Sequence, residues 1–390
     1  MTRVIIGLER LAAEKPGGLS RAGLGLLANQ ASVGNNFEHA LFVINRAFPG
    51  RLKKVFGPQH GFAGEKQDNM VESDHGVERE FGLPVYSLYG ETRKPTEDMF
   101  SGLDVLLVDL VDVGTRVYTF AQTLALCLET AGKTGVKVVV LDRPNPIGGR
   151  EVEGNILRDD CASFVGLFPT PMRHGLTLGE LARFMADHMA APPELQVIEL
   201  MNWRREQYFP ETGLPWVMPS PNMPAFETSW VYPGQVLWEG TNISEGRGTT
   251  RPFQLFGAPF IDPLDLKAEL DRSGLSGVVF RAASFQPTFH KFAGRVCGGL
   301  ELHPVDKSFK PYLTSLTILE TVIRLYPEQF AWKKPPYEYE YDRPPIDLIL
   351  GDGRLRSKLE QGVAARDLAG EWEDDVDEFK RLREKYILYS

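Results

Sequence analysis

The chain has 390 residues and a formal net charge of −9 at pH 7. This length predicts two domains, and the acidic balance without any block of lysine or arginine argues against nucleic acid or an anionic membrane as a partner. The three cysteines are far apart and form no CxxC pair, which excludes a disulfide framework or zinc site from the favoured interpretations and indicates a reducing compartment.

The N-terminal residues contain no long apolar core followed by a cleavage site, and no stretch approaches 18 apolar residues. We therefore expect a cytoplasmic protein without a membrane-spanning segment, unless the choice of start codon has removed a leader. The sequence gives no indication of the oligomeric state.

Through residue 150, short apolar runs typical of buried strands alternate with loops and with segments whose apolar residues recur at helical spacing. This alternation predicts a βαβ layout and a parallel sheet. Helices are expected at 37–48 and 119–133. Strands are expected at 23–29, 54–57, 83–89, 105–108 and 136–141. The first strand contains GLGLLA, a match to the GxGxxA form of a dinucleotide fingerprint. Because its glycines lie within the strand rather than after it, we interpret this match as chance.

The second half has a different character. A capping box formed by Thr177 and Glu180 predicts a helix over 177–189. Residues 210–259 are dense in proline and glycine but carry many aromatic residues, so we expect an ordered wall built from loops. Further strands are expected at 196–200, 278–285 and 296–303, and helices at 313–325 and over most of 358–389.

Polar residues follow each predicted strand of the first half. They are Asn29 and Gln30; Gln59 and His60; Tyr89 and Glu91; Asp109, Asp112 and Arg116; and Asp142, Arg143 and Asn145. Ligands of open α/β sheets bind beyond the carboxyl ends of the strands. We therefore predict that these residues lie along one edge of one parallel sheet and face a ligand cleft, although ion pairs at the strand exits would give the same pattern.

Three further segments carry groups suited to chemistry. Residues 58–72 supply His60, Glu65, Gln67, Asp68, Asn69 and Glu72 on a glycine-hinged loop. Residues 240–253 place Asn242, Glu245, Arg247 and Arg251 among glycines, and SPNMP holds Asn222 between prolines. A structural histidine, a solvated turn and a rigid turn are the corresponding alternatives. The histidines do not fall at metal-ligand spacing, so no metal site is predicted.

Nine ordered motifs make the chain resemble the DUF1343 family over nearly its whole length. The motifs are PQHGFAGEKQDN, LPVYSLYGETRKPT, DVGTRVYT, LDRPNPIGG, LFPTPMRHGLTLGE, PSPNMP, YPG, EGTNISEGRGTTRPF and GAPF. The resemblance implies an α/β fold with a Rossmann-like, mostly parallel sheet and a second, smaller α+β domain, with the active-site cleft between the two. We place the domains at residues 1–155 and 156–390. The resemblance also implies no nucleotide cofactor, and release of terminal N-acetylmuramic acid from peptidoglycan-derived sugars.

The chain departs from the family at one position. Family members commonly read PEHG, and the resemblance implies that this glutamate is a catalytic acid, but the present chain has Gln59 there. An amide cannot donate a proton as a carboxylic acid does. Glu65 or Glu72 could supply the proton instead, the chemistry could rely on Asp112 or Glu245, or the site could bind sugar without cutting it.

We therefore predict a glycoside hydrolase that acts on an amino sugar, with a non-catalytic muropeptide- or sugar-binding protein as the alternative. A nucleotide-dependent oxidoreductase is a further alternative, suggested by the sheet and by GLGLLA alone. The muramic-acid lactyl carboxylate is expected to bind Arg247 and Arg116. The catalytic candidates are Glu65, Glu72, Asp112 and Glu245. The substrate-binding candidates are Gln59, His60, Arg116, Tyr118, Asp142, Asn222, Asn242 and Arg247.

Overall fold

The computed structural model describes residues 2–67 and 70–390; Asp68 and Asn69, two of the predicted polar groups, lie outside the described residues. Its larger part is built on a seven-stranded sheet with the order β3-β4-β2-β1-β5-β6-β9, in which every neighbouring pair except β3 and β4 is parallel. The strands are β1 (Leu24–Ala28), β2 (Leu52–Gly57), β3 (Gly76–Val77), β4 (Pro84–Ser87), β5 (Val105–Asp109), β6 (Lys137–Leu141) and β9 (Leu195–Ile198). The predicted mostly parallel sheet is confirmed.

The central strands are buried on both faces. Along β5, Leu106 and Val108 belong to one apolar core, whereas Val105 and Leu107 belong to the other. The flanking helices are α1 (Gly7–Glu14), α2 (Ala40–Ala47), α3 (Glu97–Phe100), α4 (Thr119–Thr134) and α5 (Leu178–Asp187). Gly25 lies within β1, where an added Cβ would be 2.8 Å from Leu103 Cδ1. The glycines of GLGLLA therefore serve strand packing.

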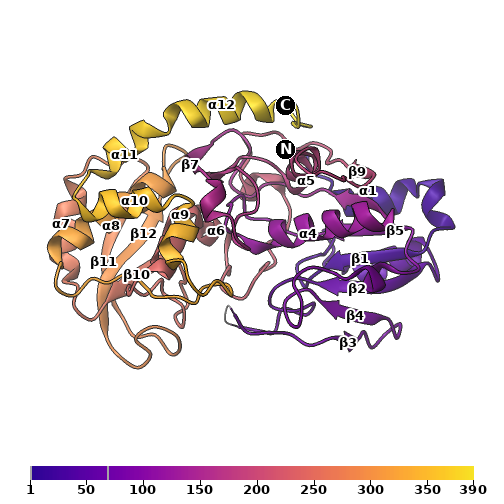
Figure 1. Ribbon diagram of the computed structural model, residues 1–390, viewed down its shortest axis with the longest axis horizontal. Helices are drawn as coiled ribbons and strands as arrows, with labels where there is room; N and C mark the ends of the chain where they lie inside the picture. Colours follow the sequence, from indigo (N-terminus) through magenta and orange to yellow (C-terminus); the bar gives the residue numbers. More distant parts are fainter. Residues whose placement is uncertain (1, 68–69) are drawn as a thin grey trace.

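The smaller part lies at the other end of the molecule (Figure 1). It contains an antiparallel sheet in the order β10-β12-β11, and a separate hairpin-like pair, β7 with β8. The strands are β7 (Glu153–Ile156), β8 (Pro171–Arg173), β10 (Leu255–Ala258), β11 (Val278–Phe285) and β12 (Cys297–Pro304). The α-helices are α6 (Phe226–Gln235), α7 (Pro263–Asp271), α8 (Pro311–Leu325), α9 (Pro345–Leu350), α10 (Gly353–Glu360), α11 (Ala365–Glu371) and α12 (Glu373–Arg383). Four 3-10 helices are distributed over the described chain. Helix η1 (Gly17–Ser20) precedes β1, and the others are η2 (Asp159–Cys161), η3 (Phe209–Thr212) and η4 (Val236–Gly240).

Residues 210–259 do not form a wall of loops alone, as the proline and glycine content predicted. They contain α6, η4 and β10. Pro233 lies near the end of α6, and the adjoining Gly234 packs so closely on α8 that an added Cβ would lie 2.0 Å from Pro311 O. The Pro–Gly pair therefore permits close packing of two helices instead of ending regular structure.

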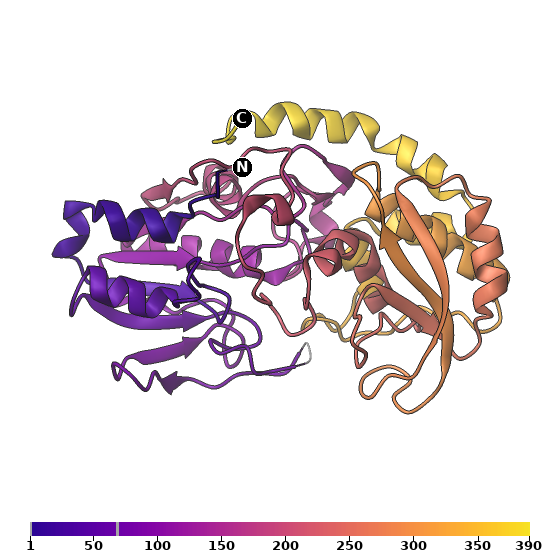
Figure 2. The same ribbon diagram turned by 180° about the vertical axis from the view of Figure 1, so that it is seen from behind.

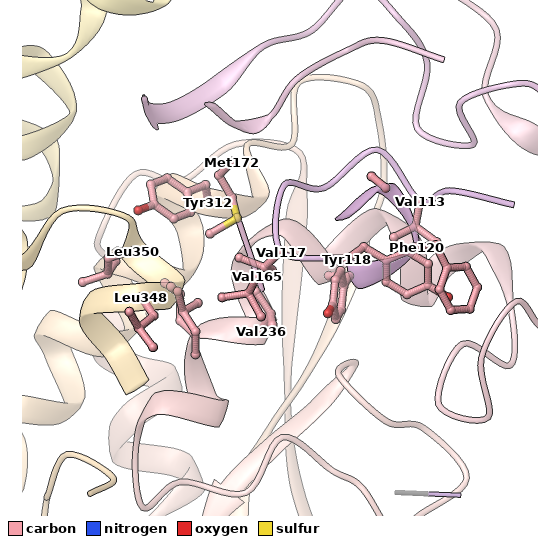
Figure 3. Packing of buried hydrophobic residues seen from close by; sticks show 14 of the residues in the cluster. Val113, Val117, Tyr118, Phe120, Val165, Met172, Val236, Tyr312, Leu348 and Leu350 are labelled. Atoms are coloured by element: carbon pink, nitrogen blue, oxygen red, sulfur yellow. The ribbon is translucent and has the colours of Figure 1, made fainter. Parts of the chain in front are cut away.

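The two parts share one continuous core. Figure 3 shows Val117, just before α4, and Phe120, in its first turn, in the same cluster as Val236 and Leu348 from the second half. Strand β9 also belongs to the first sheet, although it follows residue 155. The predicted domain boundary at residue 155 stays a prediction.

The C-terminal end of the chain returns to the first sheet. Helix α12 runs over both parts, and the two termini lie near each other, as both views show (Figures 1 and 2). The Tyr389 hydroxyl donates to Asp142 Oδ2 at 2.6 Å. Within residues 2–67 and 70–390, we find no helix with the length and apolar character needed to cross a membrane.

Because β2, β5 and β6 are parallel, their carboxyl ends meet at one edge of the sheet. The residue pairs Gln59/His60, Asp109/Asp112 and Asp142/Asn145 follow these strand ends. The prediction that they share one edge is confirmed.

Candidate active site

A narrow pocket lies where the segment after β2 and the start of α4 face η4 and the segment that precedes α9. Its cavity volume is about 40 Å³, room for about three water molecules. The lining residues are Gln59, His60, Val117, Tyr118, Thr119, Phe120, Val165, Ser220, Asn222, Met223, Tyr232, Glu239, Arg247, Phe253, Tyr337 and Glu338.

A tight turn places Glu338 in this pocket. Tyr337 and Glu340 exchange both backbone hydrogen bonds, at 3.0 and 2.9 Å, and the two residues between them have positive φ, 47° at Glu338 and 67° at Tyr339. Turns of this kind usually carry Asn-Gly, because left-handed φ is unfavourable for residues with a Cβ. Strain of about 1–3 kcal/mol per residue persists where surrounding contacts enforce it, and such places are often functional.

Contacts from the first half fix the Glu338 carboxyl. The Tyr89 hydroxyl donates to Oε2 at 2.6 Å, and the Gln59 amide nitrogen donates to Oε1 at 3.3 Å. The Thr119 hydroxyl donates to the Gln59 amide oxygen, which orients the amide nitrogen toward Glu338. Burial raises the pKa of Glu338 to about 7, even though the Tyr89 and Gln59 hydrogen bonds lower it. This carboxyl therefore holds a proton near neutral pH.

The second pocket glutamate, Glu239, has a different environment. Arg247 Nη2 lies 2.6 Å from its Oε1, and the Tyr337 hydroxyl donates to its Oε2 at 2.7 Å. Arg247 Nε is also 3.2 Å from Oε1 of Glu245. Glu239 therefore has a guanidinium on one carboxyl oxygen and a hydroxyl donor on the other. The pocket thus combines a carboxyl among neutral donors with a carboxylate beside a cation.

Glu245, a predicted catalytic residue, forms a second ion pair with Arg247. It is fully buried and is not among the described residues that line the pocket. Burial disfavours its charged form, but Lys291 at 2.9 Å, His290 at 3.2 Å and Arg247 together hold the pKa of Glu245 well below its usual range. Its contacts indicate that Glu245 positions Arg247.

The other predicted residues that line the pocket are Gln59, His60, Tyr118 and Asn222. His60 has a φ of 73°, and its Nδ1 lies 2.7 Å from Lys66 O. The Asn222 amide nitrogen donates to Gln67 O at 3.0 Å. The SPNMP segment and the loop after β2 therefore hold each other beside the pocket.

Asp142 was predicted to bind substrate, but the structure uses it to organise α5 and the C-terminus. The Thr177 hydroxyl donates to Oδ2 at 2.7 Å, and the Gly179 amide donates to Oδ1 at 2.8 Å. With Tyr389 as a further donor and no exposed surface, the carboxyl has no access to a ligand in the pocket. These contacts favour a structural role for Asp142, and its role in substrate binding stays a prediction.

Arg116 was predicted to bind the lactyl carboxylate, but it joins backbone segments instead. Its Nη1 donates at 2.9 Å to Asn155 O and at 2.9 Å to Thr170 O. Its Nη2 donates to Ile349 O and Leu350 O at 3.1 and 2.8 Å. These carbonyls belong to the β7–β8 region and α9. These contacts favour a structural role for the buried Arg116, and its role in substrate binding stays a prediction.

Asp112 and Asn242 also lie outside the described lining of the pocket. Asp112 Oδ2 accepts from the Gly114 amide at 2.6 Å and is 3.7 Å from His174 Nε2. Burial raises the pKa of Asp112 to about 7 and lowers the pKa of His174 to about 3. Asn242 bonds to the backbone of Gln329 and Ala331.

Glu65 and Glu72 were candidates for the proton donor, but both are exposed. Neither is among the described residues that line the pocket. Glu72 Oε1 accepts from the Tyr339 hydroxyl at 2.9 Å, on the outer side of the turn. The loop after β2 thus contributes Gln59 and His60 to the pocket, but not these two carboxylates.

The sequence analysis missed Glu239, Tyr337 and Glu338. The available signal was the alternation Tyr-Glu-Tyr-Glu at 337–340, which places acidic groups between aromatic ones. For Glu239 it was a single charge directly after the apolar run 236–238. Neither pattern has a motif spacing, so only proximity in space connects these glutamates with Gln59.

The fold and pocket define a two-part α/β protein whose pocket is lined by two buried glutamates, and glycoside hydrolysis generally employs two carboxyl groups. The chain belongs to the exo-β-N-acetylmuramidase family. Residues 24–227 match the profile described as "Exo-beta-N-acetylmuramidase NamZ, N-terminal", and residues 230–389 match the corresponding C-terminal profile.

Individual relatives agree with this assignment. The chain is 40% identical over 388 residues to the peptidoglycan β-N-acetylmuramidase NamZ of Bacillus subtilis (strain 168), covering 99% of this chain and 92% of that protein. Two crystal structures of DUF1343 family proteins from Bacteroides fragilis NCTC 9343 are also similar. One has a TM-score of 0.92 at 32% identity and covers both chains fully. The other has a TM-score of 0.78 at 28% identity and covers 100% of this chain and 99% of that chain.

Proposed function

We propose that the protein is an exo-acting glycosidase that releases terminal β-linked N-acetylmuramic acid from peptidoglycan-derived saccharides. The observation that carries this proposal is the pair of glutamates, Glu239 and Glu338, on one pocket in contrasting environments. The family membership and the name of the Bacillus subtilis relative support the choice of sugar.

Hydrolysis of a glycosidic bond needs one carboxyl group at the leaving oxygen and one carboxylate at the sugar ring. The charge of Glu239 is held by Arg247 and the Tyr337 hydroxyl. This suits Glu239 to stabilise the positive charge that develops at the anomeric carbon, or to activate the attacking water.

Arg247 is the proposed partner of the lactyl carboxylate, because it is the arginine among the described lining residues. It also pairs with Glu239 and Glu245. A bound lactyl group would therefore share the guanidinium with Glu239. Arg93 is a second candidate. Its guanidinium stacks on Tyr339 at 3.4 Å from the ring centroid, beside the turn that carries Glu338.

The proposal includes no cofactor and no metal ion, because the two carboxyls and water suffice for hydrolysis. The three cysteines are buried and unpaired, which supports action in the cytoplasm. The net charge of −9 argues against nucleic acid as a partner.

The direct test is incubation of the purified protein with a disaccharide of N-acetylmuramic acid β-linked to N-acetylglucosamine. We expect free N-acetylmuramic acid and N-acetylglucosamine in equal amounts, measured by mass spectrometry. The analogue that lacks the lactyl group serves as the specificity control. Binding of the disaccharide without turnover would instead support the sugar-binding alternative, and a rise in Tm with NAD(P) would revive the oxidoreductase.

A further inference from the structure

We propose that Glu338 is the general acid of this reaction and carries the proton that the family resemblance assigns to position 59. This inference rests on the proposed function and names the residue that protonates the leaving sugar. It follows from the direct contact between the Gln59 amide and the Glu338 carboxyl, which both line the pocket.

Positions 59 and 338 behave as one pair. The amide nitrogen of Gln59 lies 3.3 Å from Glu338 Oε1, and Thr119 fixes the orientation of the amide. If position 59 carried a carboxyl in this place, two acids in contact could not both be ionised, so one of them would hold a proton. With an amide at position 59, Glu338 is the member of the pair that can hold and donate the proton.

The surroundings of Glu338 suit this role. Tyr89, whose hydroxyl accepts from the Met70 amide at 3.1 Å, donates to Glu338 from the side opposite Gln59. The titratable and charged groups around Glu338 are Tyr89, Arg93, Glu239, Tyr337, Tyr339 and His60, the residue that follows Gln59. Burial and Glu239 favour the neutral carboxyl, whereas Tyr89, Gln59 and Arg93 favour its ionised form.

The proposed step balances without any other reactant. The Glu338 proton passes to the glycosidic oxygen as the bond from that oxygen to the anomeric carbon breaks, and the bonding electron pair stays on the leaving sugar. The Glu338 carboxylate that forms is stabilised by the Tyr89 and Gln59 donors. Water then supplies the hydroxyl group on the anomeric carbon and returns a proton to Glu338.

The test is Glu338→Gln on two substrates that share N-acetylmuramic acid but differ in the leaving group. On the disaccharide, we expect kcat/KM to fall by about 10²–10⁴-fold, because the leaving sugar needs a proton. On the 4-nitrophenyl glycoside, the loss should be below about tenfold, because that phenolate leaves without one. Glu340→Gln is the matched control from the same turn and should act on both substrates like the wild type.

Two further readouts separate catalysis from a structural role. The wild-type kcat/KM on the disaccharide should fall as pH rises through about 7, because Glu338 must be protonated, and Glu338→Gln should lose this limb. The exchange variant Gln59→Glu/Glu338→Gln moves the carboxyl group from position 338 to position 59 and keeps an amide as its partner. We expect recovery of at least about tenfold over Glu338→Gln; no recovery would count against positions 59 and 338 as one pair.

The outcomes distinguish this inference from the proposed function. If the wild type cleaves the disaccharide and Glu338→Gln is fully active, or loses the same factor on both substrates, Glu338 is not the acid although the function stands. If the wild type cleaves neither substrate, the proposed function itself fails. The Tm of each variant shows that the comparison is made on folded protein.

Discussion

The carboxyl edge of the seven-stranded sheet and the turn at 337–340 contrast sharply. The edge displays its charged residues after buried strands, where α/β proteins place ligands, yet Arg116 and Asp142 bind the protein's own backbone and side chains. The turn follows a proline-rich segment of no evident function, yet it places Glu338 in the pocket.

The difference follows from burial. A charged side chain between two packed halves must have partners inside the protein, and the nearest are helix N-termini and unpaired carbonyls. Asp142 accepts from the Gly179 amide at the start of α5, and both terminal nitrogens of Arg116 donate to backbone carbonyls, so these groups are engaged inside the protein. Glu338 also has partners, but they are neutral donors that leave it able to carry a proton.

The largest expected effect that separates the two regions is on catalysis. Glu239→Gln should lower kcat by about 10²–10⁴-fold on both the disaccharide and the 4-nitrophenyl glycoside, because this carboxylate acts at the sugar ring rather than at the leaving oxygen. Asp112→Asn is the matched change at the sheet edge and should cost less than about tenfold. Steady-state kinetics measure kcat for both variants. A larger loss in Asp112→Asn would mean that a carboxyl at the sheet edge takes part in catalysis.

The next effect concerns stability. Arg116→Met should lower the free energy of unfolding by at least about 3 kcal/mol, because four carbonyls lose a charged donor, although Thr170 O and Leu350 O each keep one other donor. Urea denaturation measures the change, and the folded variant should keep its preference for the muramic-acid substrate. Unchanged stability with a lost preference would mean that Arg116 binds the lactyl group after all.

A smaller effect tests Arg247 as the lactyl partner. Arg247→Ala should slow hydrolysis of both amino sugars, because Glu239 loses its ion pair. We expect a further loss of about tenfold on the muramic-acid substrate relative to its N-acetylglucosamine analogue, the value of one charge-assisted hydrogen bond. An unchanged ratio of kcat/KM values would restrict Arg247 to holding Glu239, and Arg93→Ala would then be expected to change that ratio.

The smallest effect is expected on the loop after β2. Glu65→Gln and Glu72→Gln should each leave kcat/KM on the disaccharide within about twofold of the wild type, as surface substitutions generally do. The sequence had made these residues candidates for the proton donor. A loss of 100-fold or more in either variant, confined to the disaccharide, would show that this loop supplies the proton.

The sequence by itself determined the parallel sheet and its order of strands along the chain. Uninterrupted apolar runs such as Val105–Val108 need burial on both faces, and the capping box at Thr177 and Glu180 begins α5 as predicted. The family motifs likewise identified the pocket residues Gln59, His60 and Asn222, since a polar residue on a rigid loop stays near its strand end.

Only the tertiary structure decided which carboxyls share the pocket. Glu338 is 279 residues from Gln59 along the chain, but their side chains form a hydrogen bond. No periodicity or spacing encodes such a contact, because it depends on how the second half packs over the carboxyl edge of the sheet. The same packing buries Asp142 and Arg116. These charged side chains, which the sequence suggested for ligand binding, therefore have their partners inside the protein. Local sequence sets which groups are near a strand end, and long-range packing sets which of them remain open to chemistry.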